Sequence, residues 1–247
     1  MTQTPRAPGS ALRTVLLDVD GTLIDSNDAH ARAWVDALRA HGYVVPFEQV
    51  RPLIGMGGDK VLPALTGLDP ESGEAERIGS TRSELFLAHE LPALRPTHGA
   101  RALLEHLVAE GLALVVATSA KEEEVRVLLE QAGVSDLIER ASSADDAERS
   151  KPDPDIVQAA LRLSRSQAAH SAMVGDTPYD VEAAARARVP AIALRCGGWW
   201  DDAALAGATA IYDDPADLLA HFDESPLGRA VARAASADPS TRSARSG

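Results

Sequence analysis

The chain is short of cysteine and of cationic side chains, and each shortage excludes a class of protein. Cys196 is the single cysteine among 247 residues, so no disulfide can form within the chain, and a reducing cytoplasm is its expected location. Lysine and arginine number 24 against 37 aspartates and glutamates, which gives a formal net charge of −13. Nucleic acids and anionic membranes bind clustered cations, so this balance argues against both as partners.

Long hydrophobic runs are missing too. The longest, such as residues 112–117, fall far short of the roughly 20 apolar residues that cross a bilayer. Residues 1–11 are polar and contain two prolines, unlike a secretory signal. With 45% hydrophobic and 25% charged residues, the composition is that of a soluble globular protein with a sizeable core, and we find no internal repeat.

From Pro96 onward the chain alternates between helical and strand patterns, which is typical of an α/β fold with a parallel sheet covered by helices. The first strand precedes this region, at residues 15–17, and its unbroken apolar run indicates burial on both faces. The other strands are predicted at 112–117, 138–141, 172–174, 191–194 and 210–212.

Residues 26–95 have a different pattern, with helical pieces broken by prolines and glycines. Asp25 or Ser26 is expected to cap the first of these helices, and Trp34 is expected in a core. The segment is therefore predicted to be a small helical module inserted between strands. Residues 1–11 and 225–247 lack apolar periodicity, so both are predicted to be flexible tails.

The first strand ends in two carboxylates and a glycine. Asp18 follows the strand directly, at the edge of the sheet where open α/β proteins bind ligands, and Asp20 lies two residues further on. Such close carboxylates repel unless a cation lies between them or one keeps its proton. Gly21 permits a sharp turn. Taken alone, the stretch is better explained as an Asp-Gly turn whose side chains bind the local backbone.

Polar groups also follow two later segments. Thr118 and Ser119 end the strand at 112–117, and the Thr118 hydroxyl with nearby backbone N–H groups could hold the oxygens of a transferring group. Lys151, which precedes Pro152, could neutralise such oxygens. Thr118 could instead cap a helix, and Lys151 could be a surface cation before a turn.

Asp176 ends the strand at 172–174 and could share a hard divalent cation with Asp18, with Asp180 one helical turn further on. Either later aspartate could instead cap the helix that begins near Tyr179. Asp18 itself could attack phosphorus as a carboxylate nucleophile. As an ordered set, these strand ends supply the parts of a phosphoryl-transfer site.

The same residues resemble the four sequence motifs of the haloacid dehalogenase-like hydrolase superfamily, over residues 14 to about 222. The matching segments, in order, are Asp18-Val19-Asp20-Gly21-Thr22, Thr118, Lys151-Pro152, and Gly175-Asp176 with Asp180. The resemblance implies a Rossmann-like parallel sheet at 12–25 and 96–224, with residues 26–95 as a helical cap that closes over the site.

The resemblance also implies roles for these residues. Asp18 would be the nucleophile and Asp20 the general acid and then the base. Asp18, Asp176 and the backbone carbonyl of Asp20 would bind Mg²⁺. Neighbouring carboxylates are expected to raise the pKa of Asp20, so that it keeps a proton for the leaving alcohol. Thr118, Ser119 and Lys151 would bind the phosphate. Asp180 would support the water shell of the metal.

Within the superfamily the chain resembles the branch that contains phosphoglycolate phosphatase and β-phosphoglucomutase. By that resemblance His30 would couple cap closure to Asp20; a histidine facing solvent or packing under Trp34 is the alternative. Gly175 stands where the mutase has a glutamate, and Phe86 and Leu87 where a cap lysine is expected. These departures favour hydrolysis over isomerisation.

Substrate contacts are expected from the loop at 55–60, chiefly Gly57 and Lys60, although the loop could be a simple turn between helices. Arg51 and Arg82 could assist these contacts, but both are better explained as surface cations. The Gly197-Gly198-Trp199-Trp200 loop could line the entrance or cover the sheet edge.

The sequence thus predicts an Mg²⁺-dependent phosphatase for a small soluble phosphorylated metabolite, acting as a monomer or weak homodimer. A sugar phosphomutase is the second hypothesis. A haloacid dehalogenase has no use for Asp20 or a magnesium site. A receiver-type phospho-acceptor module uses a similar Asp, Lys, Thr and Mg²⁺ set but lacks a cap, and an inactive binding protein would not need these reactive groups.

Overall fold

The computed structural model describes residues 12–237, so the predictions for 1–11 and 238–247 lie outside the described residues. Its centre is a parallel sheet with the strand order β3-β2-β1-β4-β5-β6, which confirms the α/β prediction with a Rossmann-like core. The strands are β1 Thr14–Leu17, β2 Ala113–Ala117, β3 Arg140–Ser142, β4 Ser171–Gly175, β5 Ala191–Leu194 and β6 Ala210–Tyr212.

The central position of β1 decides where the polar strand ends meet. Leu17 pairs with Val116 of β2 and with Val174 of β4. Asp18, Thr118 and Asp176 follow these three paired residues by one or two positions. Because the strands are parallel, all three side chains emerge at the same edge of the sheet.

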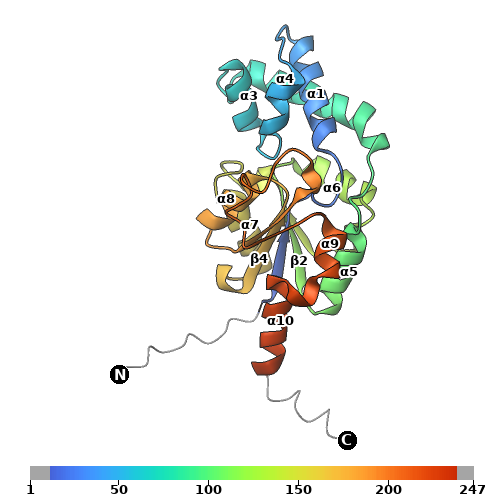
Figure 1. Cartoon of the computed structure of the whole chain (residues 1–247). Helices are drawn as coiled ribbons and strands as arrows, with labels where there is room; N and C mark the ends of the chain where they lie inside the picture. The colour runs from blue at the N-terminus through green and yellow to red at the C-terminus, as the bar shows by residue number, and fades with distance from the viewer. Residues whose placement is uncertain (1–11, 238–247) are drawn as a thin grey trace, which may run out of the picture.

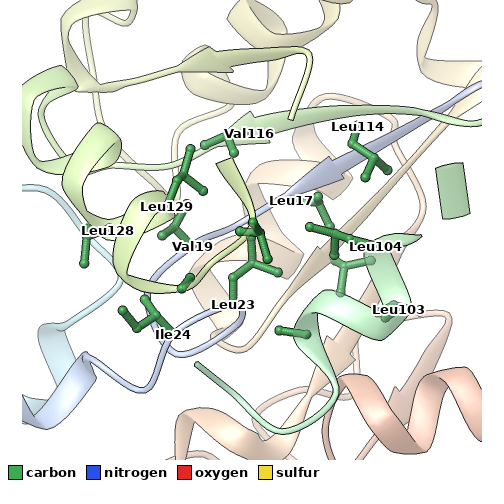
Figure 2. Packing of buried hydrophobic residues seen from close by; sticks show 14 of the residues in the cluster. Leu17, Val19, Leu23, Ile24, Leu103, Leu104, Leu114, Val116, Leu128 and Leu129 are labelled. Atoms are coloured by element: carbon green, nitrogen blue, oxygen red, sulfur yellow. The ribbon is translucent and has the colours of Figure 1, made fainter. Parts of the chain in front are cut away.

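Helices cover both faces of the sheet (Figure 1). Leucines of two helices on one face join Leu17, Leu114 and Val116 of the sheet in a large hydrophobic core (Figure 2). That face carries α5 Ala100–Ala109, α6 Glu122–Gln131 and α9 Pro215–Ala220, and the other carries α7 Asp155–Ser164 and α8 Pro178–Arg186. β1 is buried on both sides for this reason, which explains its unbroken apolar sequence.

The segment predicted to be the cap is built from helices that lie over the carboxyl edge of the sheet (Figure 1). It has a hydrophobic core of its own, which includes Trp34 and Leu38. Its boundaries at residues 26 and 95 stay predictions. Its elements are α1 Asn27–Ala40, α2 Phe47–Val50, α3 Gly58–Thr66 and α4 Gly73–Leu85, with the 3-10 turns Arg51–Leu53 and Leu91–Ala93 and a π-helical turn at Phe86–Glu90.

The prediction of a flexible tail from residue 225 is wrong for the part that the structure describes, because Pro226–Ala237 forms helix α10. Leu227 is buried and joins the core under the sheet. The Ser225 hydroxyl accepts the Gly228 N–H, and proline opens the helix, so a serine cap followed by proline was the sequence signal. Val231, one helical turn further on, packs against the same core, so the two residues dock the helix.

Short 3-10 turns complete the described chain, at Ser135–Leu137, Ala144–Asp146, Ala168–His170, Arg195–Gly197 and Phe222–Glu224. Among residues 12–237, no helix has both the length and the apolar character that a membrane crossing requires.

Candidate active site

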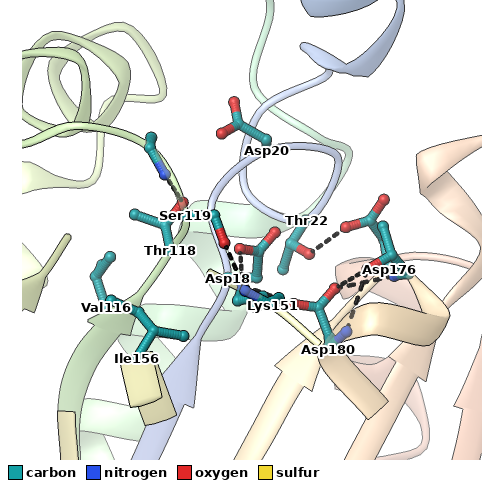
Figure 3. Close-up of polar contacts among 12 residues, drawn as sticks. Asp18, Asp20, Thr22, Val116, Thr118, Ser119, Lys151, Ile156, Asp176 and Asp180 are labelled. Carbon is teal, nitrogen blue, oxygen red and sulfur yellow. Dashed lines mark hydrogen bonds and ion pairs between the residues drawn. The ribbon is translucent and has the colours of Figure 1, made fainter. Parts of the chain in front are cut away.

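Asp18 and Lys151 meet at the carboxyl edge of the sheet. The Lys151 Nζ donates to Asp18 Oδ1 at 2.5 Å and to Asp180 Oδ1 at 2.6 Å, and all three side chains are buried (Figure 3). Burial lowers the pKa of Lys151, but the two carboxylates outweigh it and raise the pKa above its ordinary value. Lys151 therefore stays cationic, and it is not the surface cation that its sequence context alone allowed.

Asp176 lies beside this pair and is held by residues that the sequence did not single out. The Thr22 hydroxyl donates to its Oδ1 at 3.1 Å and the Asn27 side-chain amide donates to its Oδ2 at 2.7 Å. A Cβ added at Gly197 would lie only 1.9 Å from Oδ2, so only glycine fits there. Burial, followed by the charge of Asp180, raises the pKa of Asp176 to about 7.

Three of these carboxylates fit a divalent metal. Asp18, Asp176 and Asp180 each offer an oxygen, and the three oxygens lie within 4.8 Å of one another. Burial also raises the pKa of Asp18, although Lys151 opposes the shift. Oxygen donors suit hard cations such as Mg²⁺, and a cation would remove the cost of burying several carboxylates beside one lysine.

Asp180 belongs to the same cluster, and its carboxylate accepts a hydrogen bond from Lys151. Its support of the metal's water shell stays a prediction. The same side chain accepts the Thr177 N–H and hydroxyl in a capping box at the start of α8. The capping interpretation is therefore correct for Asp180, and the same side chain also contacts Lys151.

Thr118 and Ser119 line the cavity next to Asp18. The Thr118 hydroxyl accepts the Ala120 N–H at 3.2 Å and does not cap α6, whose N-cap residue is Lys121. The Thr118 N–H donates to the Ser142 carbonyl at 3.3 Å, and the binding of substrate oxygens by the Thr118 hydroxyl and neighbouring N–H groups stays a prediction. Ser119 accepts the Lys151 N–H at 3.4 Å, which ties this loop to the lysine.

Asp20 faces the other way, away from Asp176 and Asp180 (Figure 3). Its Oδ1 accepts the Ser26 hydroxyl at 2.6 Å and lies 2.7 Å from His30 Nε2. Ser26 occupies the N-cap position of α1, but its hydroxyl makes no capping bond. The contact between His30 and Asp20 is the one that the family resemblance implied, and His30 is buried against Phe86 with ring centroids 3.9 Å apart.

The expected rise in the pKa of Asp20 is wrong. Burial does raise it, but the charge of His30, hydrogen bonds from His30 and Ser26, and the charge of Arg82 together lower the pKa below its ordinary value. The pKa is lowered because the Asp20 side chain points away from the other carboxylates and toward the predicted cap, where its neighbours are hydrogen-bond donors and cations.

Arg82 was expected on the surface, and that expectation is wrong. Its side chain is 14% exposed, and its Nη1 donates to both oxygens of Glu124 at 2.5 and 2.7 Å. Its Nη2 lies 2.9 Å from His30 Nδ1. Ser83 adds a hydrogen bond to Glu124 at 2.7 Å. Because Glu124 lies on α6 of the core, these contacts join the predicted cap to the core.

Arg51 was also expected on the surface and is buried instead. Its Nε donates to Asp28 at 2.5 Å, and another of its N–H groups donates to the Gly197 carbonyl. Its guanidinium lies over Trp199, 5.6 Å from the ring centroid. In the tryptophan loop, Trp199 therefore packs against Arg51 of the predicted cap. Trp200 lies edge-on to Tyr179 at the start of α8.

The loop at 55–60 contacts the segment before Lys151. The Gly57 N–H donates to the Ser150 hydroxyl at 3.0 Å, and Lys60 pairs with Asp153 at 2.5 Å. Gly57 lines the cavity, whereas the Lys60 ammonium is occupied by Asp153. The loop therefore holds the predicted cap against the core, which was not foreseen.

A cavity of about 320 Å³ lies above Asp18, between the predicted cap and the core. Asp18, Asp20 and His30 form one part of its wall, and Trp34 and Leu62 are among the apolar residues of another part. Asp18 is only 4% exposed, and it lies on the wall of this cavity. The volume suits a small metabolite.

Known proteins share both this sequence pattern and this fold. The model of the haloacid dehalogenase-like hydrolase family matches residues 15–194. A phosphoglycolate phosphatase of Rhodospirillum rubrum is 33% identical over 217 residues, which cover 83% of this chain and 89% of that protein.

Two solved structures are similar over most of their length. A hydrolase from Pseudomonas syringae has a TM-score of 0.79 at 29% identity, covering 86% of this chain and 98% of that one. A β-phosphoglucomutase from Clostridium difficile has a TM-score of 0.75 at 15% identity, covering 90% and 99%, and shows the fold alone. The chain therefore belongs to the haloacid dehalogenase-like hydrolase family, and within it to the enzymes that act on phosphate esters.

Proposed function

We propose that this protein is an Mg²⁺-dependent phosphatase that hydrolyses a small phosphomonoester through an aspartyl phosphate on Asp18. The observation that carries the proposal is the placement of Asp18: a buried carboxylate on the wall of the cavity, held by Lys151 and close to Asp176. When bound, Mg²⁺ would neutralise the phosphoryl oxygens and the nucleophile.

In the first step an oxygen of Asp18 forms a bond to phosphorus and the bond to the leaving alcohol breaks. Lys151, which contacts Asp18 directly, neutralises negative charge on the transferring group. Asp20 gives a proton to the leaving oxygen. The proton is available because Asp20 Oδ1 lies 2.7 Å from His30 Nε2, so the two groups can share it despite the lowered pKa of Asp20.

In the second step water attacks phosphorus, the bond to Asp18 breaks, and phosphate is released. Asp20 takes a proton from the water, and its lowered pKa keeps it ionised for this role as base. Ser26 and His30 fix its orientation. We propose that opening of the helical segment 26–95 then releases the products.

A phosphomutase is the second candidate, and one observation favours it. The cap lysine expected near residue 86 is absent, but Arg82, one helical turn earlier, places a cation beside His30. Hydrolysis remains our proposal because Glu124 already neutralises that cation. Hexose 1-phosphates distinguish the two: an isomeric sugar phosphate as product supports the mutase, and free phosphate supports the phosphatase.

The proposal is tested by a phosphate-release screen over metabolite phosphoesters with and without Mg²⁺, with an aryl phosphate as a generic substrate. We expect Mg²⁺-dependent release that is absent from Asp18→Asn. Full activity of that variant would exclude the mechanism.

We further propose a cytoplasmic location, which a chain with one cysteine supports, and a monomer or weak homodimer as the working form. Size-exclusion chromatography with light scattering at two protein concentrations tests the second point. A stable higher oligomer would contradict it.

A further inference from the structure

The cavity described above must bind the alcohol part of the substrate, because Lys151 and the metal ligands are directed at the phosphoryl group. Its charges therefore bear on which alcohols it accepts. Among the described residues that line it, the cationic side chains are Arg82 and Lys121. Besides Asp18 and Asp20, the carboxylates that line the cavity are those of Asp59, Glu76, Glu124 and Glu148.

The two cations differ in what they have left to offer a ligand. Arg82 binds both oxygens of Glu124 and the ring of His30, so its charge is already balanced. Lys121 is exposed, and among residues 12–237 it has no ion-pair partner. The Lys121 ammonium is therefore the one positive charge on the described walls of the cavity that no carboxylate already balances.

Three of the carboxylates that line the cavity are not paired with a cation. Glu76 on α4 and Glu148, three residues before Lys151, are exposed and have no ion-pair partner among the described residues. Asp59 on α3 accepts only the Ser150 N–H, at 3.2 Å. Three carboxylates thus face one lysine, and an anionic alcohol would enter against a negative field.

We propose that the cavity selects phosphate esters whose alcohol carries no second anionic group, and that a cationic amino group on the alcohol improves binding. This inference rests on the proposed phosphatase function. The proposed substrates are therefore neutral or cationic at the alcohol. Enzymes whose substrate carries a carboxylate or a second phosphate beside the ester would have a different preference.

A matched series of two-carbon esters tests the inference: 2-aminoethyl phosphate, 2-hydroxyethyl phosphate and carboxymethyl phosphate. They have nearly the same size and differ in the charge at the far end. We expect kcat/KM to fall in that order, with at least about a tenfold difference between the first and the last. Where turnover is too slow, the inhibition constant against aryl phosphate hydrolysis gives the same order.

Two controls assign the preference to the cavity rather than to the chemistry of the alcohols. Neutralising the wall in the double variant Glu76→Gln, Glu148→Gln should shrink the ratio between the amino and carboxylate esters. Glu110→Gln, at the C-cap of α5 and so close to the amino end of β2, on the opposite edge of the sheet from the cavity, should leave the ratio unchanged. Added salt should also shrink it, because the carboxylates are exposed.

A carboxymethyl ester handled as well as the hydroxyethyl ester, or better, would overturn the inference while leaving the phosphatase proposal standing. A ratio that neither the double variant nor salt changes would overturn it as well. Absence of aryl phosphate hydrolysis would instead be a failure of the proposed function, and the inference would fall with it.

Discussion

Two groups of side chains meet between the sheet and the predicted cap, and they are held in place differently. The sheet-edge cluster (Asp18, Lys151, Asp176 and Asp180) comes from strand ends and the loops beside them. The cap network (His30, Arg82 and Glu124) joins helices α1 and α4 to α6 of the core. The first is held mainly by residues of the sheet edge, although Asn27 of α1 also donates to Asp176, whereas the second includes the ion pair of Arg82 with Glu124, which joins the helical segment to the core.

This difference suggests a division of labour. On our proposal, the sheet-edge cluster would hold a phosphoryl group whether or not the helical segment has opened. Asp20 contacts both regions, since it follows β1 and binds His30. Proton transfer by Asp20 would therefore depend on closure, and phosphoryl binding would not. Variants in each of the two regions test whether their roles differ in this way.

The largest effect is expected from Asp18→Asn. An amide cannot attack phosphorus, so kcat/KM should fall at least about 10⁴-fold for every substrate. Steady-state assays on the folded variant, checked by circular dichroism, give the measurement. The control is Asp36→Asn on the exposed side of α1, which should keep wild-type activity. Comparable losses in both variants would point to damage unrelated to the nucleophile.

The next largest effect is expected from Asp176→Asn. Losing one carboxylate of the cluster should raise the Mg²⁺ concentration for half-maximal activity at least about tenfold. A titration of activity against Mg²⁺ measures it. Thr22→Val removes only a hydrogen bond to Asp176 and should cause a smaller shift in the same direction. Unchanged Mg²⁺ dependence in Asp176→Asn would remove this residue from the metal site.

His30→Asn should have a smaller, substrate-dependent effect. Its loss disturbs proton delivery through Asp20, so kcat/KM should fall about 10- to 100-fold for alkyl phosphates, which need a proton on the leaving oxygen. An aryl phosphate with a good leaving group should be affected less. Asp176→Asn serves as the comparison, because it should slow both classes equally. Equal losses for both classes in His30→Asn would break the contrast between the two regions.

The smallest effect on turnover, and a clear one on stability, is expected from Glu124→Gln. Burial raises the pKa of Glu124, but Arg82, with His30 and Ser83, outweighs it and lowers the pKa below its ordinary value. A lowered carboxyl pKa adds stability above the unfolded value of about 4.3, and that stability is lost as pH falls through the folded value.

The free energy of unfolding of Glu124→Gln should therefore be lower than that of the wild type by about 2 kcal/mol at pH 7. The gap should close as the pH falls below about 4. Urea titrations at several pH values measure it. Glu123→Gln, the exposed neighbour on α6, is the matched control and should show no such gap. A gap that grows toward low pH would contradict the assigned pairing.

The sheet-edge cluster could be predicted from the sequence because its geometry follows from the fold. Once buried parallel strands were placed, Asp18, Thr118 and Asp176 had to emerge at one edge. Lys151 lies in no strand, and its place came from the family resemblance. The helix α10 was missed because most of its apolar residues are alanines, so that only Leu227 and Val231 mark the face that packs on the core.

The cap network could not be predicted, because it depends on how separate helices dock. Arg82 and Arg51 look like ordinary surface arginines in the sequence, and only packing of the helical segment on the core buries them. Glu124 lies among three consecutive glutamates, and nothing local marks it as the buried one. The same docking turns Asp20 toward donors, which is why the expected direction of its pKa shift was wrong.

The central claim is that the phosphoryl group passes through Asp18 before water takes it. The direct test is the stereochemistry at phosphorus, with a phosphomonoester made chiral by oxygen isotopes. Two in-line displacements, first by Asp18 and then by water, predict retention of configuration in the released phosphate. Inversion would mean a single direct attack by water and would contradict the account.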